Sequence, residues 1–312
     1  MFVPLKHYNK GFPLVSVWMI SFNHEKFINQ AIESILDQET DFEIELVIGD
    51  DYSLDNTRQI ISSYYERYPE IIKPLFHEKN VGIARNVVTT LEACRGKYIA
   101  LLEGDDYWID RYKLKKQVEF LERNTSVSLC YTQAKDVDEI SGVEKIVGKE
   151  HPKKTTLNYL LEHGWFIRTA TIMFPRIALK NIPEWFFHSY STDYILHILL
   201  AENGQIVRLE DITAVYRRHP KGISVASIEV QQRRWVDKLK LLKKIDEYFS
   251  YKYTANIKKQ SKAYLFAIGI SLLRDSKIWS SRFSGIKYIN KAGFVYSLKI
   301  ILVRLGRKMR TA

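Results

Sequence analysis

Residues 97–108 read KYIALLEGDDYW, and this stretch decides the fold class. An apolar run ends in Glu103, and Asp105 and Asp106 follow almost at once. Such a run is typical of a buried strand in a parallel sheet. Acids at the carboxyl end of such a strand lie where open α/β sheets bind their ligands. Because clustered carboxylates repel one another, the pattern indicates either a divalent cation that bridges phosphate oxygens or a solvated turn that caps a helix from about Asp110.

Three strand-like runs, each followed by a helical pattern, precede this stretch. They cover residues 14–23, 44–48 and 75–77. Asn23 is placed to cap the first helix, and Ser53 and Asp55 to open the second. Strands that alternate with helices predict βαβ units and a parallel sheet, so four successive strands deliver polar residues to one edge.

Four motifs follow one another in a fixed order across about residues 12–220. They read ISFN at 20–23, GDDYSLDNT at 49–57, NVGIARN at 80–86 and EGDD at 103–106. In these motifs the chain resembles glycosyltransferase family 2, the inverting transferases of the GT-A fold that use nucleotide-diphosphate sugars. Tyr52 stands where the family pattern has glycine, and Glu103 where it has its first Asp. The sequence has neither a GxGxxG after its first strand nor a P-loop pattern, which argues against a dinucleotide dehydrogenase and a P-loop NTPase.

The resemblance implies a set of donor-binding residues. Asp51 is expected to accept a hydrogen bond from the base, which suits the ring N–H of uracil or thymine. Asp105 is expected to be the principal ligand of Mn²⁺ or Mg²⁺. The full set comprises Ser21, Asn23, Glu25, Asp51, Asn80, Gly82, Arg85, Asn86, Glu103, Gly104, Asp105, Arg217 and Arg218. Structural alternatives remain open, namely helix caps for Asn23 and Asp50 and a surface ion pair for Arg85.

Asp193 is the predicted catalytic base. It lies in Ser191-Thr192-Asp193, just before the helical run YILHILLA at 194–201. The resemblance implies that an acid at the start of this helix takes the proton from the acceptor hydroxyl as that hydroxyl attacks the anomeric carbon. An acid that only stabilises the helix start is the alternative, and Glu184 is the second candidate for the base.

Residues 205–224, QIVRLEDITAVYRRHPKGIS, predict a strand that ends in basic residues. The resemblance implies that Arg217 and Arg218 neutralise the leaving diphosphate and that His219 completes the metal shell. A purely structural histidine is the alternative.

Length and cysteine usage favour a catalytic domain with an extension. The catalytic domain is predicted over 1–228, with a nucleotide-sugar half over about 12–125 and an acceptor half over about 126–228. Cys94 and Cys130 lie too far apart to suggest a zinc cluster or a disulfide framework, and Cys130 is expected to be a buried thiol. The first ten residues lack an apolar leader, which favours a reducing, cytoplasmic setting. The polar residues 140–157 are expected to form an irregular loop over the site.

Charge divides sharply along the chain. Residues 1–228 contain 27 Lys and Arg against 31 Asp and Glu, whereas residues 229–312 contain 20 against 5, so the basic excess belongs to the C-terminal region. Helices are predicted there over 229–250, about 256–275 and 284–306. The last apolar stretch is broken by Lys299 and falls short of the ~20 residues that a membrane span needs. A basic amphipathic extension favours an anionic membrane surface as partner. A solvated basic face is the first alternative, and nucleic acid, for which no binding motif is present, is a distant one.

These patterns together predict an α/β protein with a GT-A, Rossmann-like and mostly parallel sheet, flanked by helices and followed by a helical extension. The predicted activity is inverting, metal-dependent transfer of a hexose from a UDP- or dTDP-sugar to a growing, lipid-linked surface glycan. The predicted location is the inner face of the cell membrane. One alternative is a non-catalytic nucleotide-sugar-binding or scaffold protein that keeps the fold. Another is a nucleotidyltransferase, which would need a Gly-rich triphosphate loop that SFNHEKF at 21–27 does not provide.

Overall fold

The computed structural model describes residues 11–220, 222, 227–275 and 279–293. The chain forms two compact units. The first comprises Met1–Leu157 and Trp165–Gly222, and the second Asn158–Gly164 and Ile223–Ala312. The boundary thus lies near 222 rather than at the predicted 228, and a short segment of the predicted acceptor half belongs to the second unit.

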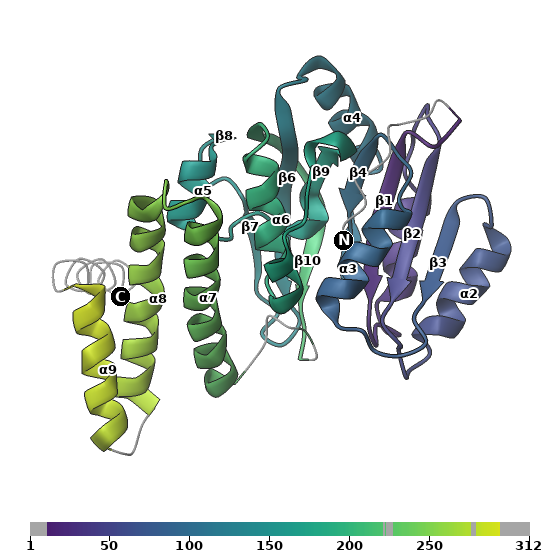
Figure 1. Ribbon diagram of the computed structural model, residues 1–312. Helices are drawn as coiled ribbons and strands as arrows, with labels where there is room; N and C mark the ends of the chain where they lie inside the picture. The colour runs from purple at the N-terminus through teal and green to yellow at the C-terminus, as the bar shows by residue number, and fades with distance from the viewer. Residues whose placement is uncertain (1–10, 221, 223–226, 276–278, 294–312) are drawn as a thin grey trace. The chain divides into compact units, whose positions relative to one another are not determined.

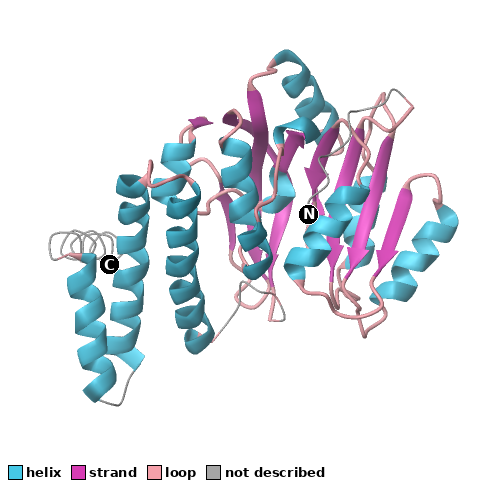
Figure 2. Cartoon of the chain, viewed as in Figure 1, coloured by secondary structure: helices cyan, strands magenta, loops and turns pink. Residues whose placement is uncertain are grey.

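A ten-stranded sheet organises the described part of the first unit (Figures 1 and 2). Its order is β3-β2-β1-β4-β9-β6-β10-β5, with β7 beside β6 and β8 beside β10. The strands are β1 (Val15–Ser21), β2 (Ile44–Asp50), β3 (Ile72–Phe76), β4 (Tyr98–Leu101), β5 (Tyr107–Trp108), β6 (Val127–Asp138), β7 (Glu144–Val147), β8 (Lys154–Thr155), β9 (Ile172–Pro175) and β10 (Gln205–Arg218).

Most of the long strands run the same way. Strands β3, β2, β1 and β4 are mutually parallel. Strand β9 is antiparallel to both β4 and β6, which makes β6 parallel to β4, and β10 is parallel to β6. The predicted α/β fold with a mostly parallel sheet is therefore confirmed. The carboxyl ends of β1, β2, β4, β6 and β10 consequently meet at one edge, and this geometry gathers the polar residues of distant segments.

Helices cover the sheet and close its core. They are α1 (Ile28–Leu36), α2 (Thr57–Arg67), α3 (Ile83–Ala93), α4 (Lys113–Arg123) and α6 (Thr192–Ala201), of which α3 and α6 lie in front of the strands in Figure 1. Helix α1 buries Ile28, Ala31, Ile32 and Ile35, which share one face at helical spacing. This face packs into one cluster with alternate residues of β1, including Val17. Helix α1 begins at Ile28 with Phe27 at the capping position, so the prediction that Asn23 caps it is wrong.

Two other local predictions differ from the structure. Residues 140–157 are not a plain loop, because they contain β7 and β8, which hydrogen-bond to β6 and β10. Helix α4 begins at Lys113 rather than near Asp110, because β5 first pairs Trp108 with Ala214 of β10.

The second unit is helical where it is described. It contains α7 (Ile228–Tyr248), α8 (Thr254–Asp275) and α9 (Trp279–Ala292), together with most of α5 (Leu157–His163). Helices α8 and α9 approach closely, because a Cβ on Gly269 would lie 2.8 Å from the carbonyl oxygen of Gly285. The predicted helix over 284–306 is described only up to Ala292, and residues 294–312 lie outside the described part. No helix among the described residues combines the length and apolarity needed to cross a bilayer.

Candidate functional site

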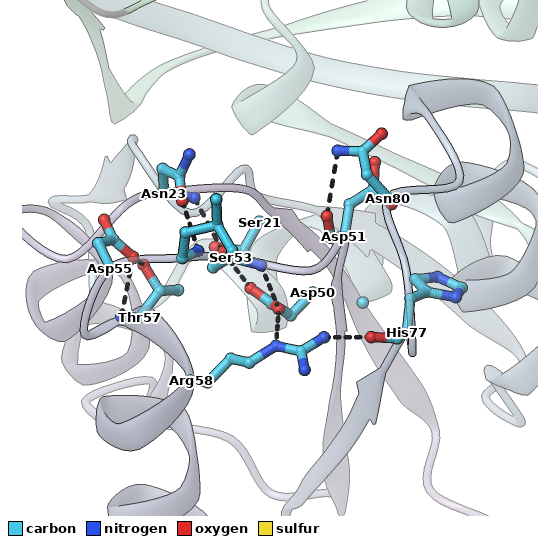
Figure 3. Close-up of polar contacts among 12 residues, drawn as sticks. Ser21, Asn23, Asp50, Asp51, Ser53, Asp55, Thr57, Arg58, His77 and Asn80 are labelled. Carbon is cyan, nitrogen blue, oxygen red and sulfur yellow. Dashed lines mark hydrogen bonds and ion pairs between the residues drawn. The ribbon is translucent and has the colours of Figure 1, made fainter.

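Two loops at the sheet edge bind each other through Asn23 and Ser53 (Figure 3). The backbone N–H of Asn23 donates to the Ser53 hydroxyl at 2.9 Å, and the Asn23 side-chain oxygen accepts from the backbone of Leu54 at 2.8 Å. The Ser53 hydroxyl in turn donates to Asp50 at the end of β2. Asn23 has a φ of 56°, a left-handed conformation that asparagine adopts more readily than most residues. The Asn23 side chain therefore stabilises the loop after β2 rather than capping α1 as the sequence predicted.

Glu25 extends the same connection toward α2. Its backbone N–H donates to Asp55, and its carboxylate accepts from the backbone of Asn56, each at 3.2 Å. Asp55 also accepts from the backbone of Thr57 at 3.0 Å. Partial burial raises the pKa of Asp55, but the hydrogen bonds from Thr57 outweigh it and leave the pKa below its usual value. Asn23 and Glu25, both predicted to line the nucleotide pocket, thus make contacts that shape the loops.

Asp51 fixes the turn that precedes α3. Its two carboxylate oxygens accept from the backbone N–H groups of Val81 and Gly82, at 2.6 and 3.0 Å. The Asn80 side chain donates to the Asp51 carbonyl oxygen at 3.2 Å, and Gly82 has a φ of 82°, which favours glycine. Each carboxylate oxygen keeps a second lone pair for a ligand. The structure therefore brings three predicted donor-binding residues together, while Asp51 itself is mostly buried.

Asn86 faces the protein interior rather than the sheet edge. Its side chain donates to the carbonyl oxygen of Gly49 at 2.9 Å and lies 3.0 Å from the His77 imidazole. Asn86 is thus held by other protein groups, and its predicted role in donor binding stays a prediction. Arg85, one position earlier, is exposed, and its guanidinium carbon lies 5.8 Å from the ring centroid of Phe187.

Two histidines converge on one oxygen of Asp105. The Nε2 atom of His219 lies 3.2 Å from Asp105 Oδ2, and the Nε2 atom of His24 lies 3.8 Å from the same oxygen. Burial alone would raise the pKa of Asp105, but the hydrogen bond with His219 outweighs it and lowers the pKa. Burial lowers the pKa of His24 despite the neighbouring carboxylate, which favours the neutral imidazole. Asp105 is thus an anionic carboxylate with two imidazole nitrogens near one of its oxygens.

Arg217 donates hydrogen bonds to other residues through both its backbone and its guanidinium group. Its Nη1 donates to the backbone oxygen of Asp105 at 2.7 Å, its backbone N–H donates to Asp106 at 2.8 Å, and its Nη2 donates to Gln30. The guanidinium also lies over the Tyr107 ring, 4.3 Å from its centroid. The buried guanidinium of Arg217 therefore links the Asp105 loop to β10, and its contact with the diphosphate stays a prediction. Arg218, the next residue, is exposed.

Glu103 and Asp193 lie close enough to influence each other. Burial of its carboxyl group, followed by the charges of Asp105 and Asp193, raises the pKa of Glu103 to about 8, so Glu103 is largely protonated at pH 7. Its Oε2 atom is buried and has no hydrogen-bond partner. Asp193 lies in the first turn of α6, where its Oδ1 accepts from the backbone of Tyr194 at 2.7 Å. Glu184, the second candidate for the base, is exposed in the 3₁₀ helix Glu184–His188.

Gly104 makes room for the groups around Asp105. A Cβ at this position would lie 2.7 Å from His24 Nδ1 and 3.2 Å from the Ser21 hydroxyl. Ser21 is buried, and its hydroxyl lies 3.5 Å from His24 Nδ1. The predicted residues Ser21 and Gly104 therefore enclose the His24 ring, which the sequence analysis did not identify. A single histidine in a loop carries no spacing signal that would have revealed it.

The groups around Asp105 fit a divalent cation by their chemistry. Two ligand atoms bound to one ion at about 2.1 Å and at a right angle lie about 3 Å apart. The separation of His219 Nε2 and Asp105 Oδ2, 3.2 Å, is close to this value. Within the described ranges, no group of three or more His, Cys, Asp or Glu side chains is arranged to hold a metal ion by itself. A cation that also binds a substrate diphosphate needs only one or two protein carboxylates.

The parallel sheet and its acidic edge define a GT-A fold of the nucleotide-sugar transferase type, and comparison with known proteins gives the family. The profile described as "Glycosyl transferase family 2" matches residues 16–182, more than half of the chain. The chain belongs to glycosyltransferase family 2. It spans 63% of the length of the mycobacterial relatives it matches.

Proteins of similar sequence and one solved structure of similar fold accompany this family match. The chain is 34% identical over 227 residues to an uncharacterized protein of Mycobacterium tuberculosis, an alignment that covers 71% of this chain and 63% of that relative. It is 32% identical over 222 residues to the Escherichia coli enzyme WfgD, a UDP-Glc:alpha-D-GlcNAc-diphosphoundecaprenol beta-1,3-glucosyltransferase, covering 71% and 84% of the two chains. Its fold resembles that of the mannosyltransferase PcManGT from Pyrobaculum calidifontis, solved with GDP-Man and Mn²⁺, with a TM-score of 0.59, 15% identity and coverage of 98% and 83%.

Proposed function

We propose that this glycosyltransferase transfers a sugar, with inversion, from a UDP- or dTDP-sugar to a growing glycan on a lipid carrier. The observation that carries the proposal is the gathering of Asp105, His219, Glu103 and Asp193 around one sheet edge. The name of the E. coli relative states a UDP-sugar donor and a lipid-diphosphate acceptor, which supports the donor and acceptor classes for this chain.

Asp51 and the turn it holds would bind the base. Its carboxylate accepts two backbone hydrogen bonds and retains lone pairs for the ring N–H of uracil or thymine. The loops joined by Asn23 and Glu25 would shape the rest of the nucleotide pocket. Because these contacts are already made, donor binding needs little loop ordering, and its entropic cost is correspondingly small.

Asp105 and His219 would hold a divalent cation, which is consistent with the Mn²⁺ in PcManGT. When bound, such a cation offsets the negative charge that develops on the leaving diphosphate. Arg217 would act on the same group indirectly, because it holds the Asp105 backbone in place. Arg85 and Arg218 are exposed and remain free to approach the phosphates or the sugar.

Asp193 would accept the proton of the acceptor hydroxyl as that hydroxyl attacks the anomeric carbon from the face opposite the diphosphate. Its neighbour Glu103 is largely neutral at pH 7 and so adds little repulsion to a second carboxylate.

The basic region 229–312 would bring the enzyme to the anionic inner face of the cell membrane, where a lipid-linked acceptor lies. Its excess positive charge, 20 Lys and Arg against 5 Asp and Glu, supports this location.

Thermal unfolding with a panel of nucleotide sugars, each with and without Mn²⁺, tests the donor class. UDP- or dTDP-sugars should raise the melting temperature, and the anomeric configuration of the transferred sugar, measured by NMR, should be inverted. Stabilisation without any turnover across a panel of lipid-linked acceptors would favour the non-catalytic alternative, and retention of configuration would refute the mechanism.

A further inference from the structure

His24 occupies a position at Asp105 that neither the family motifs nor the predicted metal site uses. It lies in the loop between β1 and α1, and its Nε2 faces the same carboxylate oxygen as His219. Its backbone N–H donates to the Thr57 hydroxyl at 2.8 Å, so the loop itself is anchored. The imidazole is therefore presented to Asp105 by a fixed backbone.

The surroundings of His24 suit a metal ligand. Its side chain is 18% exposed, so the imidazole lies mostly inside the protein beside Asp105, and imidazole is a common metal ligand. On the opposite side, Nδ1 lies 3.5 Å from the Ser21 hydroxyl, and metal-binding histidines usually have such a partner at their other nitrogen. Gly104 supplies the space, because a Cβ there would come within 2.7 Å of Nδ1.

We infer that His24 is an additional ligand of the cation at Asp105, and that the site consequently prefers Mn²⁺ over Mg²⁺. This inference rests on the proposed metal-dependent function. Mg²⁺ strongly prefers oxygen ligands, whereas Mn²⁺, although the weakest binder of the first-row transition metals, accepts an imidazole nitrogen more readily than Mg²⁺ does. Two imidazoles beside one carboxylate therefore shift the selectivity toward Mn²⁺.

The imidazole of His24 must move slightly closer to Asp105 to bind the same cation as His219. His24 Nε2 lies 3.8 Å from Asp105 Oδ2, compared with 3.2 Å for His219, and the described side chains do not form a finished cluster. The contact between His24 Nδ1 and Ser21, at 3.5 Å, is long enough to permit a small rotation of the ring. The donor diphosphate then supplies the remaining oxygen ligands.

Direct binding of Mn²⁺, measured by EPR in the presence of UDP and with Mg²⁺ as competitor, tests the inference without requiring turnover. The Gln in His24→Gln cannot reproduce an imidazole ligand, so the affinity for Mn²⁺ should fall about tenfold while that for Mg²⁺ changes less, and the Mn²⁺ preference should shrink. Pulsed EPR of bound Mn²⁺ should show nitrogen coupling from two imidazoles in the wild-type protein and from one in the variant. His163→Asn, at an exposed histidine stacked on Tyr159, is the matched control and should bind as the wild type does.

Gly104→Ala provides a second route, because it keeps His24 but places a methyl group against its ring. It should weaken Mn²⁺ binding in the same direction. Unchanged Mn²⁺ affinity and unchanged nitrogen coupling in His24→Gln, while Asp105→Asn abolishes binding, would refute the role of His24 and leave the proposed function intact. If the wild-type protein binds UDP but neither cation, the metal-dependent function fails as well.

Discussion

His219 Nε2 lies 3.2 Å from Asp105 Oδ2, although the two residues are 114 positions apart in the chain. The contact joins the residue after β10 to the acidic turn after β4. No local sequence signal pairs these segments, so the sheet order is what brings them together. One carboxylate oxygen thereby lies near imidazole nitrogens from two separate parts of the chain, which makes Asp105 the most informative position to change.

Asp105→Asn should abolish sugar transfer while the protein stays folded, because the substitution removes the charge but hardly changes the volume. Circular dichroism and the melting temperature would check the fold, and initial rates with Mn²⁺ would measure the activity. Asp41→Asn, at an exposed residue paired only loosely with Lys115 at 3.4 Å, serves as the control. Full activity of Asp105→Asn, or of the wild-type enzyme after exhaustive EDTA treatment, would contradict a metal-dependent reaction.

Asp193→Asn should lower the turnover rate by about two to four orders of magnitude, which is the usual contribution of a general base. Donor affinity, measured by calorimetry with the nucleotide sugar, should stay near that of the wild-type enzyme, because Asp193 acts on the acceptor. Glu184→Gln should have little effect on either quantity. An equal loss of donor affinity in Asp193→Asn would show instead that this acid only supports the start of α6.

Two substitutions of Asn23 distinguish the effect of its left-handed backbone on stability from the effect of its side-chain hydrogen bond. Asn23→Gly keeps the positive φ accessible but loses the side-chain contact to Leu54, whereas Asn23→Ala loses the contact and also strains the backbone. Urea unfolding should therefore rank the stabilities as wild type, then Gly, then Ala, with a total loss of about 1–3 kcal/mol. Both variants should bind UDP more weakly, since the joined loops shape the pocket. Equal stability of all three proteins would mean that the loops are held by other contacts.

Lys113 should make stability depend on pH. It is fully buried, with Nζ 2.6 Å from Gln117 Oε1, and burial lowers its pKa from 10.5 to about 7. Between these two values the unfolded chain binds more protons than the folded one, so the free energy of unfolding contributed by Lys113 rises with pH from about 7 to about 10. The slope should approach, at most, about 1.4 kcal/mol per pH unit. Below pH 7 this contribution is lost and the slope levels off.

Urea titrations at pH 7, 8 and 9 would measure this slope as the difference between the wild-type protein and Lys113→Met. Lys115→Met, at a partly exposed lysine on the same helix, removes a similar side chain without removing a buried charge. Its stability should run parallel to that of the wild type. If the curve of Lys113→Met is parallel as well, the pKa of Lys113 is not lowered in the folded state.

The basic C-terminal region should bind anionic liposomes, and the binding should weaken as salt rises, because exposed charges are screened beyond about 8 Å at physiological ionic strength. Flotation of the full chain would be compared with that of two fourfold glutamine variants. The first replaces basic residues of the C-terminal region, namely Arg304, Arg307, Lys308 and Arg310. The second replaces exposed lysines of the first unit, namely Lys145, Lys149, Lys153 and Lys180. Only the first should lose binding; equal flotation of both would contradict the membrane role of the C-terminal region.

The sequence was sufficient to predict the parallel sheet and its acidic edge, because acids that directly follow apolar strands must meet where those strands end. Side-chain orientation was harder to predict. Arg217 points inward and Arg218 outward, and alternation along β10 could not decide this, since irregularities near Arg208 and Ile212 shift its register with β6. The role of Asn23 also depends on a residue 31 positions away. Local capping rules therefore predicted a structural role for Asn23, but they gave α1 rather than the loop after β2 as the segment that it contacts.

Strand β9 has a consequence for how substrates enter. It hydrogen-bonds to β4 on one side and to β6 on the other, and β6 pairs with β10. The strand before Asp105 and the strand that ends in Arg218 therefore belong to one continuous hydrogen-bonded sheet. The part of the sheet with β4 and the part with β6 cannot separate by a hinge motion without breaking backbone hydrogen bonds. A substrate must therefore reach this site without a hinged separation of these strands.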